Sequence, residues 1–198
     1  MHPMILENLV VISGVVYIFL SLRQNNWCWP IGMLCVTGWF FLALDGRLYM
    51  DAALQLCYLG LSIYGWWQWL KGDTGKPITL RSISKRELCC SLATIAVLTP
   101  IFAMLTTHIL NASLSWLDSF TTMMCLAAQW MLARKILENW LFWLVADSLY
   151  IYIYIDKGWY KLAGVMAVYS LLAIWGYISW KKSLDTDATP PGKAQALA

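Results

Sequence analysis

Seven apolar segments follow one another along the 198 residues, with polar residues between them. Each segment approaches the roughly 20 residues that a helix needs to cross the hydrocarbon core of a bilayer, and aromatic or snorkelling ends shorten that requirement. The pattern therefore predicts an all-α integral membrane protein with seven transmembrane helices. The predicted helices cover residues 5–22, 28–44, 48–70, 88–107, 113–133, 140–155 and 160–180.

The composition also favours a membrane protein. Apolar residues make up 60% of the chain and charged residues 13%, whereas about a quarter of the residues in a soluble domain are charged. The thirteen Trp and ten Tyr residues fit helix ends anchored at the membrane–water interface. The net charge of +3 is spread over loops, which gives no patch for a nucleic acid.

Motifs for metal binding or intramembrane catalysis are missing from the sequence. The six Cys residues form no CxxC pair, and the two His residues have no partner at metal-ligand spacing. No HExxH or GxSxG motif occurs. We therefore expect no metal, no cofactor and no enzymatic activity.

The distribution of Lys and Arg predicts how the chain is oriented in the membrane. With seven helices, eleven basic residues fall on the side of the longest loop, 71–87, and three fall on the opposite side. Cytoplasmic loops carry the excess of basic residues. The expected location is the bacterial cytoplasmic (inner) membrane, with the N-terminus outside and the C-terminus in the cytoplasm.

The chain contains an internal repeat. Residues 45–69 and 156–180 share a skeleton at a constant offset of 111, with the pairs Asp45/Asp156, Tyr49/Tyr160, Ala52/Ala163, Tyr58/Tyr169, Gly65/Gly176 and Trp69/Trp180. An Asn-Trp dipeptide precedes each copy, at Asn26-Trp27 and Asn139-Trp140, with an offset of 113. Such repeats are typical of transporters with one substrate site between the repeats. The paired glycines indicate close helix contacts or hinges.

The repeat and the charge distribution together predict a three-plus-one-plus-three arrangement. Three helices reverse the direction of the chain, so an unpaired helix at 88–107 is needed to keep the second repeat parallel to the first. The expected domains are a first three-helix repeat at 1–70, a cytoplasmic loop and linker helix at 71–109, a second three-helix repeat at 110–180, and a flexible cytoplasmic tail at 181–198.

Three motifs resemble the PnuC family of vitamin transporters. They are IYGWWQW at 63–69, QWMLARKILENWLFW at 129–143, and Trp116-x-Asp118, which precedes the second of these segments. The ARKxxENWLxW stretch is the most specific of them, and the resemblance extends to Trp180. It implies a fold similar to that of the SWEET sugar transporters, and facilitated diffusion by alternating access. It also implies uptake of a vitamin such as nicotinamide riboside, thiamine or riboflavin, a membrane lipid environment, and a possible homotrimer.

The substrate expected from the resemblance depends on four positions. Nicotinamide riboside transporters of the family carry Asn at three positions that align with Cys35, Ser62 and Asp147, whereas Gln55 is retained. Replacing amides by an acid and smaller groups favours a thiamine transporter, similar to the thiamine-transporting subgroup. Nicotinamide riboside is the alternative within the family, a membrane scaffold is the alternative from another class, and proton coupling stays open.

Asp147 is the strongest candidate for substrate binding. It lies about midway along the sixth predicted helix, where a lone carboxylate costs on the order of 3 kcal/mol. Trp140, Trp143 and Tyr150 lie on the same helical stripe, and their rings could bind a flat cation. Alternative roles are a hydrogen bond between helices or protonation for Asp147, and interfacial anchoring for Trp140.

Further candidates lie on the third and fifth predicted helices. Gln55, Tyr58 and Ser62 share one face of the third helix, and a buried Gln needs a partner or a wet cavity. On the fifth helix Gln129 is a candidate for the binding site, and Asp118 and Trp116 are candidates for its external mouth. N-capping is the alternative role of Asp118.

Overall fold

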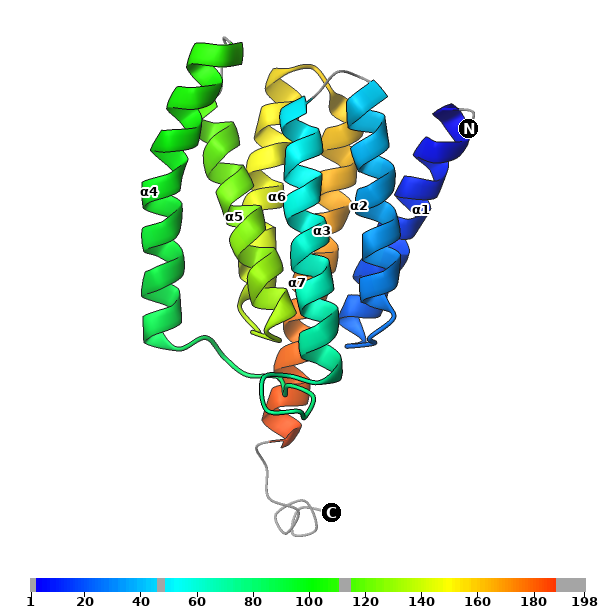
Figure 1. The fold of residues 1–198 in the computed structure, drawn as a ribbon, viewed down its shortest axis with the longest axis vertical. Helices are drawn as coiled ribbons and strands as arrows, with labels where there is room; N and C mark the ends of the chain where they lie inside the picture. The colour runs from blue at the N-terminus through cyan, green and yellow to red at the C-terminus, as the bar shows by residue number, and fades with distance from the viewer. Residues whose placement is uncertain (1–2, 46–48, 111–114, 188–198) are drawn as a thin grey trace. The chain divides into compact units, whose positions relative to one another are not determined.

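The computed structural model describes residues 3–45, 49–110 and 115–187, and its regular structure is helical apart from one isolated bridge between Arg81 and Ile136 (Figure 1). The predicted all-α class is confirmed, and each predicted segment corresponds to one helix in this part of the chain. The helices are α1 (Pro3–Leu22), α2 (Cys28–Asp45), α3 (Tyr49–Leu70), α4 (Lys85–Leu110), α5 (Ser115–Ala133), α6 (Asn139–Asp156) and α7 (Tyr160–Asp187).

Three of the described helices are long and apolar enough to cross a membrane on length and composition alone. The qualifying stretches are Cys28–Asp45, Lys85–Thr107 and Tyr160–Thr186. Asn8–Leu22 is a shorter apolar stretch. The candidate binding residues Gln55, Gln129 and Asp147 lie on α3, α5 and α6, which are outside this set.

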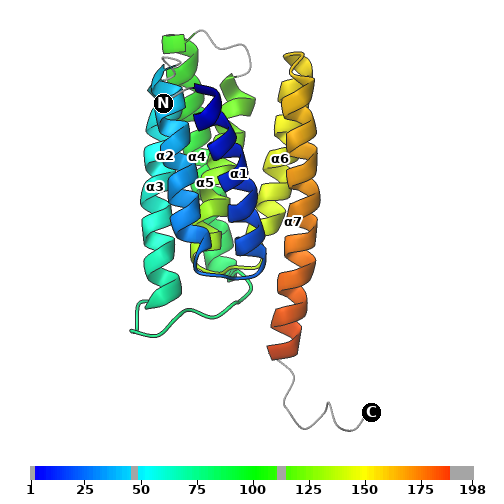
Figure 2. The ribbon, with the colours of Figure 1, turned by 90° about the vertical axis from the view of Figure 1, so that its right-hand side faces the viewer.

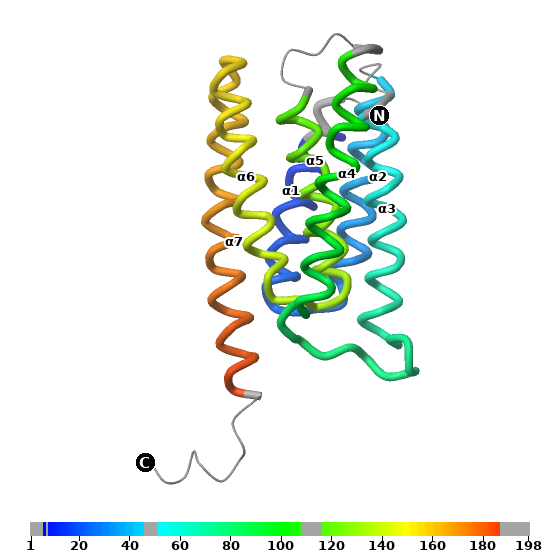
Figure 3. The backbone as a smooth tube through the Cα atoms, turned by 90° about the vertical axis from the view of Figure 1, so that its left-hand side faces the viewer, coloured from blue at the N-terminus to red at the C-terminus, as the bar shows by residue number. Residues whose placement is uncertain are grey.

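The chain divides into two compact units. Unit 1 comprises Met1–Thr79 with Leu132–Lys135, and unit 2 comprises Leu80–Met131 with Ile136–Ala198. Within unit 1, α2 packs against both α1 and α3 (Figure 2). Within unit 2, α6 and α7 pack side by side along their length (Figure 3). The predicted boundaries of the two three-helix repeats stay a prediction.

Most helix ends agree with the sequence-based expectation within two residues, whereas both ends of α4 and the end of α7 differ by three residues or more. The α7 helix continues to Asp187, so the prediction of a flexible tail from residue 181 was wrong for 181–187, and the rest of the predicted tail lies outside the described residues. Residues 181–187, KKSLDTD, contain neither Gly nor Pro, and a helix satisfies its own backbone hydrogen bonds in water as well as in lipid.

The α4 helix begins at Lys85, three residues before the apolar stretch, because a capping box sets its start. The Glu87 backbone N–H donates to Ser84 Oγ at 3.2 Å, and the Ser84 N–H donates to Glu87 Oε2 at 3.1 Å. Glu87 also accepts two hydrogen bonds from the Arg81 guanidinium, at 2.7 and 2.6 Å. This carboxylate holds the pKa of Arg81 above its usual range.

The internal repeat extends to the helix ends. The ends of α1 and α5, both ends of α2 and α6, and the starts of α3 and α7 each differ by 111 residues. Trp29 on α2 is therefore the counterpart of Trp140 on α6. The sequence paired Trp140 with Trp27, at an offset of 113, because both follow an Asn. That pairing was wrong, since the starts of α2 and α6 differ by 111 residues.

The turns that follow α1 and α5 also have the same backbone. Gln24 and Lys135, again 111 apart, adopt positive φ angles of 51° and 49°. Each turn closes with a hydrogen bond of 2.9 Å, from the N–H of Asn25 to the Leu20 carbonyl and from the N–H of Ile136 to the Met131 carbonyl. This is the Schellman motif, which ends a helix with a left-handed residue.

Candidate binding site

Asp147 lies about midway along α6 in unit 2, and its side chain is buried with 6% exposure. Among the residues that the structure describes, no hydrogen bond or ion pair reaches its carboxylate. A buried carboxylate without a partner is costly in a membrane-spanning helix. Binding of a cation would compensate for that cost.

Aromatic rings flank Asp147 along the same face of α6. Trp143, one turn before it, and Tyr150, one turn after it, are both half-buried. The Tyr150 ring stacks on Tyr154, with the centroids 5.6 Å apart and the planes at 19°. The acid therefore lies between two rings that are partly accessible, an arrangement suited to a flat cation.

The α5 helix carries a polar stripe that meets α6 at Tyr150. The Tyr150 and Thr122 hydroxyls share a hydrogen bond, and Asp118 and Cys125 lie close enough to Tyr150 for an electrostatic interaction. Gln129 continues the stripe and is buried. Within unit 2 the structure thus brings the stripe of α5 to the aromatic face of α6.

The predicted mouth residues lie in the first turn of α5. Asp118 is exposed, and a carboxylate there interacts favourably with the helix dipole, as expected for its alternative capping role. Trp116 is also exposed. A role of either residue at an external mouth stays a prediction.

Trp140 packs inside unit 2. Its indole is 4% exposed and meets Trp180 edge to face, at 5.5 Å between centroids and 90° between planes. A Cβ atom at Gly176 would overlap the Trp140 ring. This burial agrees with a packing role for Trp140 rather than direct contact with a substrate.

The equivalent residues of unit 1 form the same arrangement. Trp29 and Trp69 meet edge to face at 5.4 Å and 88°, and a Cβ atom at Gly65 would overlap the Trp29 ring. The prediction that the paired glycines mark close helix contacts is confirmed. Sequence inspection missed Trp29, although its offset of 111 from Trp140 was the signal that could have revealed it.

The remaining candidates lie in unit 1. On α3, Gln55 and Tyr58 are half-buried, and Ser62 is 1% exposed, with no hydrogen-bond partner for its Oγ among the described residues. On α2, the Cys35 thiol donates a hydrogen bond to the Val10 carbonyl at 3.4 Å, which ties it to α1. Binding of a substrate by these four side chains stays a prediction.

Metal ligation has no candidate in the described part of the chain, where no group of three or more His, Cys, Asp or Glu residues lies close enough together. The six Cys residues are free thiols. The chemistry available to the candidate site is therefore charge, stacking and hydrogen bonding.

Comparison with known proteins identifies the family. The family described as nicotinamide mononucleotide transporter matches residues 4–182. The riboflavin/roseoflavin transporter RibM of Streptomyces davaonensis is 27% identical over 184 residues, which cover 90% of this chain and 85% of that protein. The nicotinamide riboside transporter PnuC of Escherichia coli K12 is 22% identical over 204 residues, which again cover 90% of this chain and 85% of that protein.

A solved structure shows the same fold. The crystal structure of the vitamin B3 transporter PnuC has a TM-score of 0.70 and 21% identity, and the match covers 89% of this chain and 80% of that one. The resemblance of the three sequence motifs to the PnuC family is thereby confirmed. The chain belongs to the nicotinamide mononucleotide transporter (PnuC) family.

Proposed function

We propose that this protein is a membrane transporter that takes up nicotinamide riboside. The family match over residues 4–182 supports transport, and the Escherichia coli relative PnuC is a nicotinamide riboside transporter. Neither of the two named relatives is described as a thiamine transporter. The preference for thiamine that followed from the residue exchanges therefore has no support from them.

The buried carboxylate of Asp147, which has no hydrogen-bond or ion-pair partner among the described residues, is the observation that carries the choice of a cationic vitamin, and the similarity to a nicotinamide riboside transporter favours that compound over thiamine. Nicotinamide riboside has a permanently charged pyridinium ring, which could pair with that carboxylate between Trp143 and Tyr150. The family resemblance implies an Asn at this position in nicotinamide riboside transporters, and Asp adds a negative charge there. Such a change strengthens the attraction for a cationic ring.

Riboflavin is the second candidate, because RibM is more similar to this chain than the Escherichia coli PnuC in percentage identity. Its ring system carries no positive charge, so Asp147 would then have to act as a hydrogen-bonding group or be protonated. The two candidates differ in the role that they give to the carboxylate.

For the mechanism, we propose facilitated diffusion by alternating access, with two parallel three-helix repeats joined by α4. The 111-residue offset of the helix ends and of the Trp–Gly contacts supports this arrangement. For the orientation, we propose that the C-terminal end of α7 lies in the cytoplasm of a bacterial cell. Assembly as a homotrimer stays a prediction from the family resemblance.

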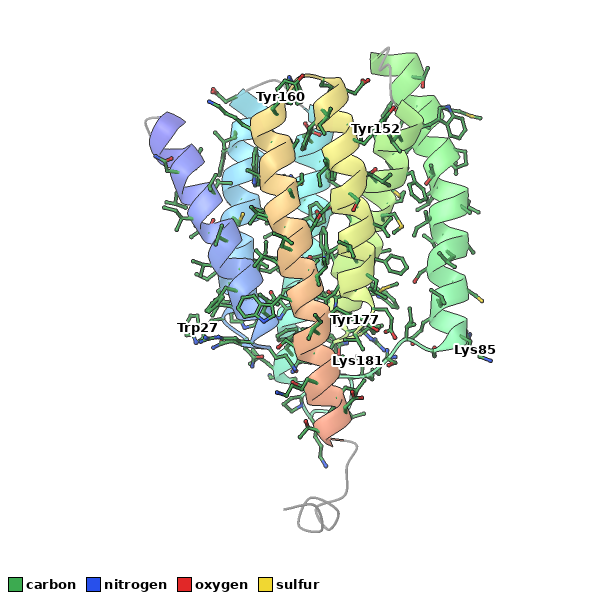
Figure 4. The ribbon with its side chains drawn as sticks, turned by 180° about the vertical axis from the view of Figure 1, so that it is seen from behind. Trp27, Lys85, Tyr152, Tyr160, Tyr177 and Lys181 are labelled. Carbon is green, nitrogen blue, oxygen red and sulfur yellow. The ribbon has the colours of Figure 1, made fainter. Side chains whose placement is uncertain are left out.

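The side chains at the two ends of the α6–α7 pair support a membrane-spanning position of this pair. Figure 4 shows Tyr152 and Tyr160 at one end, and Tyr177 and Lys181 toward the other. Aromatic side chains near both ends of a helix pair are typical of residues at the two membrane–water interfaces, and Lys is typical of the cytoplasmic one.

Binding titrations on the purified protein test the substrate. Nicotinamide riboside, riboflavin and thiamine are titrated separately by isothermal calorimetry, and we expect saturable heat with nicotinamide riboside. Binding of riboflavin alone would replace the first candidate by the second. Absence of binding by all three would contradict vitamin transport and favour a membrane scaffold.

A further inference from the structure

The turn between α6 and α7 places an exposed indole ring beside the aromatic face of α6. Gly158 has a φ angle of 72°, and its N–H donates to the Ile155 carbonyl at 3.0 Å. The next N–H, that of Trp159, donates to the Tyr154 carbonyl at 2.7 Å. These bonds form a Schellman motif, which brings the side chain after the left-handed residue back onto the last turn of the helix. Accordingly the rings of Trp159 and Tyr154 are in contact, with their centroids 6.0 Å apart.

Three aromatic rings of unit 2 therefore form one row, which we call the aromatic row: Trp159, Tyr154 and Tyr150. Trp159 contacts Tyr154, and Tyr154 stacks on Tyr150 at 5.6 Å. Exposure decreases along the row, since Trp159 is 52% exposed and the two Tyr side chains are half-buried. Asp147 lies one turn before Tyr150, whereas Tyr154 lies one turn after it. The row thus leads along α6 from the surface of unit 2 to the buried acid.

The spacing of the rings suits the passage of a flat cation. A cation is attracted to an aromatic ring when it lies within about 6 Å of the ring centroid. The two successive distances in the row are 6.0 and 5.6 Å. A cation that moves along the row therefore comes within reach of the next ring before it loses the previous one.

The outermost ring already holds a cation. The Lys157 ammonium lies 5.3 Å from the centroid of the Trp159 ring. Both side chains are exposed, so the contact is weak and a cation from solution can replace the ammonium. Lys157 thus occupies the place that a cationic ligand would take, and it competes with that ligand.

The aromatic row occurs in only one of the two repeats. At the offset of 111, Tyr154 corresponds to Ala43 and Trp159 to Leu48 in the sequence. The repeated fold therefore does not require these rings, in contrast to the Trp–Gly contacts, which recur in both units. Residues that differ between the repeats are the ones that can recognise an asymmetric substrate.

We propose that the aromatic row is the entry path of the transporter. Trp159 first binds a flat aromatic cation in place of the Lys157 ammonium, and the two Tyr rings then guide the cation to Asp147. The proposal rests on the proposed function and orientation. In that orientation the C-terminal end of α7 is cytoplasmic, so the turn at the other end of α7 faces the outside, where the substrate arrives.

Uptake kinetics test the role of the Trp159 ring. We expect Trp159→Leu to raise the KM for external nicotinamide riboside about three- to tenfold with an unchanged maximal rate, because the site at Asp147 is intact. Trp159→Phe keeps an aromatic ring and should stay within about twofold of the parent KM. Tyr160→Leu is the matched control, since Tyr160 is 71% exposed and lies at the same end of the α6–α7 pair (Figure 4). The same KM in Trp159→Leu and Tyr160→Leu would overturn the path, because anchoring at the membrane interface would then explain both.

A change at Lys157 should act in the opposite direction. We expect Lys157→Gln to lower the KM about two- to fivefold, because the competitor for the Trp159 ring is gone. Lys161→Gln removes the same charge four residues later, and among the described residues Lys161 makes no cation–π contact, so its KM should stay within twofold of the parent. In a Trp159→Leu background, Lys157→Gln should have no effect. Equal effects of the two Lys variants would indicate a general influence of surface charge and would overturn the competition.

Binding at the outermost ring can be observed without transport. The protein is labelled with 5-fluorotryptophan, and the fluorine resonance that is missing from Trp159→Phe belongs to Trp159. We expect 1-methylnicotinamide, whose pyridinium ring is charged, to shift this resonance saturably in the parent and in Asp147→Asn, and neutral nicotinamide to leave it in place. No shift with the charged compound, or equal shifts with both, would overturn a cation site at Trp159.

The outcomes distinguish the path from the proposed function. A parent protein that neither binds nor transports nicotinamide riboside would overturn the proposed function and the path with it. A parent that transports it normally, with an unchanged KM in Trp159→Leu, would overturn the path alone.

Discussion

At the scale of single residues, the two repeats differ where a substrate can be recognised. In the 111-residue frame set by the helix ends, Asp147 corresponds to Val36, Trp143 to Gly32 and Tyr150 to Trp39. The acid and the Trp one turn before it therefore occur in only one repeat. An asymmetric substrate needs such differences, whereas the Trp–Gly contacts are the same in both units because they hold helices together.

Replacing Asp147 by Asn tests the role of its charge. The variant keeps the size and burial of the side chain but loses the negative charge, so we expect the affinity for nicotinamide riboside to fall by about 10- to 100-fold. Titration calorimetry measures it. Ser148→Ala is the control on the same helix, since Ser148 is exposed and its hydroxyl donates, among the described residues, only to the Leu144 carbonyl, at 2.7 Å. Equal affinities of the wild type and Asp147→Asn would exclude a charge pair.

Individual residues could be predicted from the sequence only where the chemistry is local. Asp147 stands out because a carboxylate interrupts an apolar run, and a helical stripe brings Trp143 and Tyr150 to its face. The contact of Arg134 with Tyr64 spans 70 residues, so no local pattern could reveal it. Trp29 was missed for a different reason: a shared Asn-Trp dipeptide suggested the wrong partner for Trp140.

At the scale of helices, tight packing of a Trp ring on a Gly fixes α3 on α2 in unit 1 and α7 on α6 in unit 2. The sequence predicted close contacts at both glycines but not the ring that each one meets. The facing ring depends on how two helices cross, which a single helical pattern does not contain.

Adding one methyl group at either contact glycine should destabilise the fold. For Gly65→Ala and Gly176→Ala we expect a loss of about 1–3 kcal/mol, because the new Cβ overlaps an indole ring in a packed interior. Thermal unfolding in detergent measures the change. Gly60→Ala and Gly164→Ala are matched controls, since an added Cβ meets nothing within 4 Å at either position. Equal melting temperatures for all four variants would contradict the packing assignment.

The turn after α1 offers a change in the opposite direction. Gln24 has a φ angle of 51°, a conformation that costs a residue with a Cβ roughly 1–2 kcal/mol and costs Gly little. We therefore expect Gln24→Gly to stabilise the protein by up to about 1 kcal/mol, seen as a higher melting temperature. Gln24→Ala should give no gain, and a gain of the same size there would show that the lost side chain, not the backbone, was responsible.

At the scale of the whole molecule, hydropathy predicted the number and the order of the described helices, because each segment is long enough to be read by itself. It predicted most helix ends within two residues and failed at α4 and at the end of α7. The α7 helix continues past its apolar part, and α4 begins at a capping box in the polar loop. The placement of the candidate residues into one binding site stays a prediction, since Asp147 belongs to unit 2 and Gln55, Tyr58 and Ser62 belong to unit 1.

Uptake into proteoliposomes tests the central claim, that this family member transports a cationic vitamin, most directly. Purified protein is reconstituted without any ion gradient, and uptake of labelled nicotinamide riboside is followed with and without unlabelled substrate inside. We predict saturable uptake that internal substrate accelerates and that Asp147→Asn strongly reduces, while Ser148→Ala leaves it unchanged. Uptake no faster than in protein-free liposomes, or equal uptake by wild type and Asp147→Asn, would contradict the account.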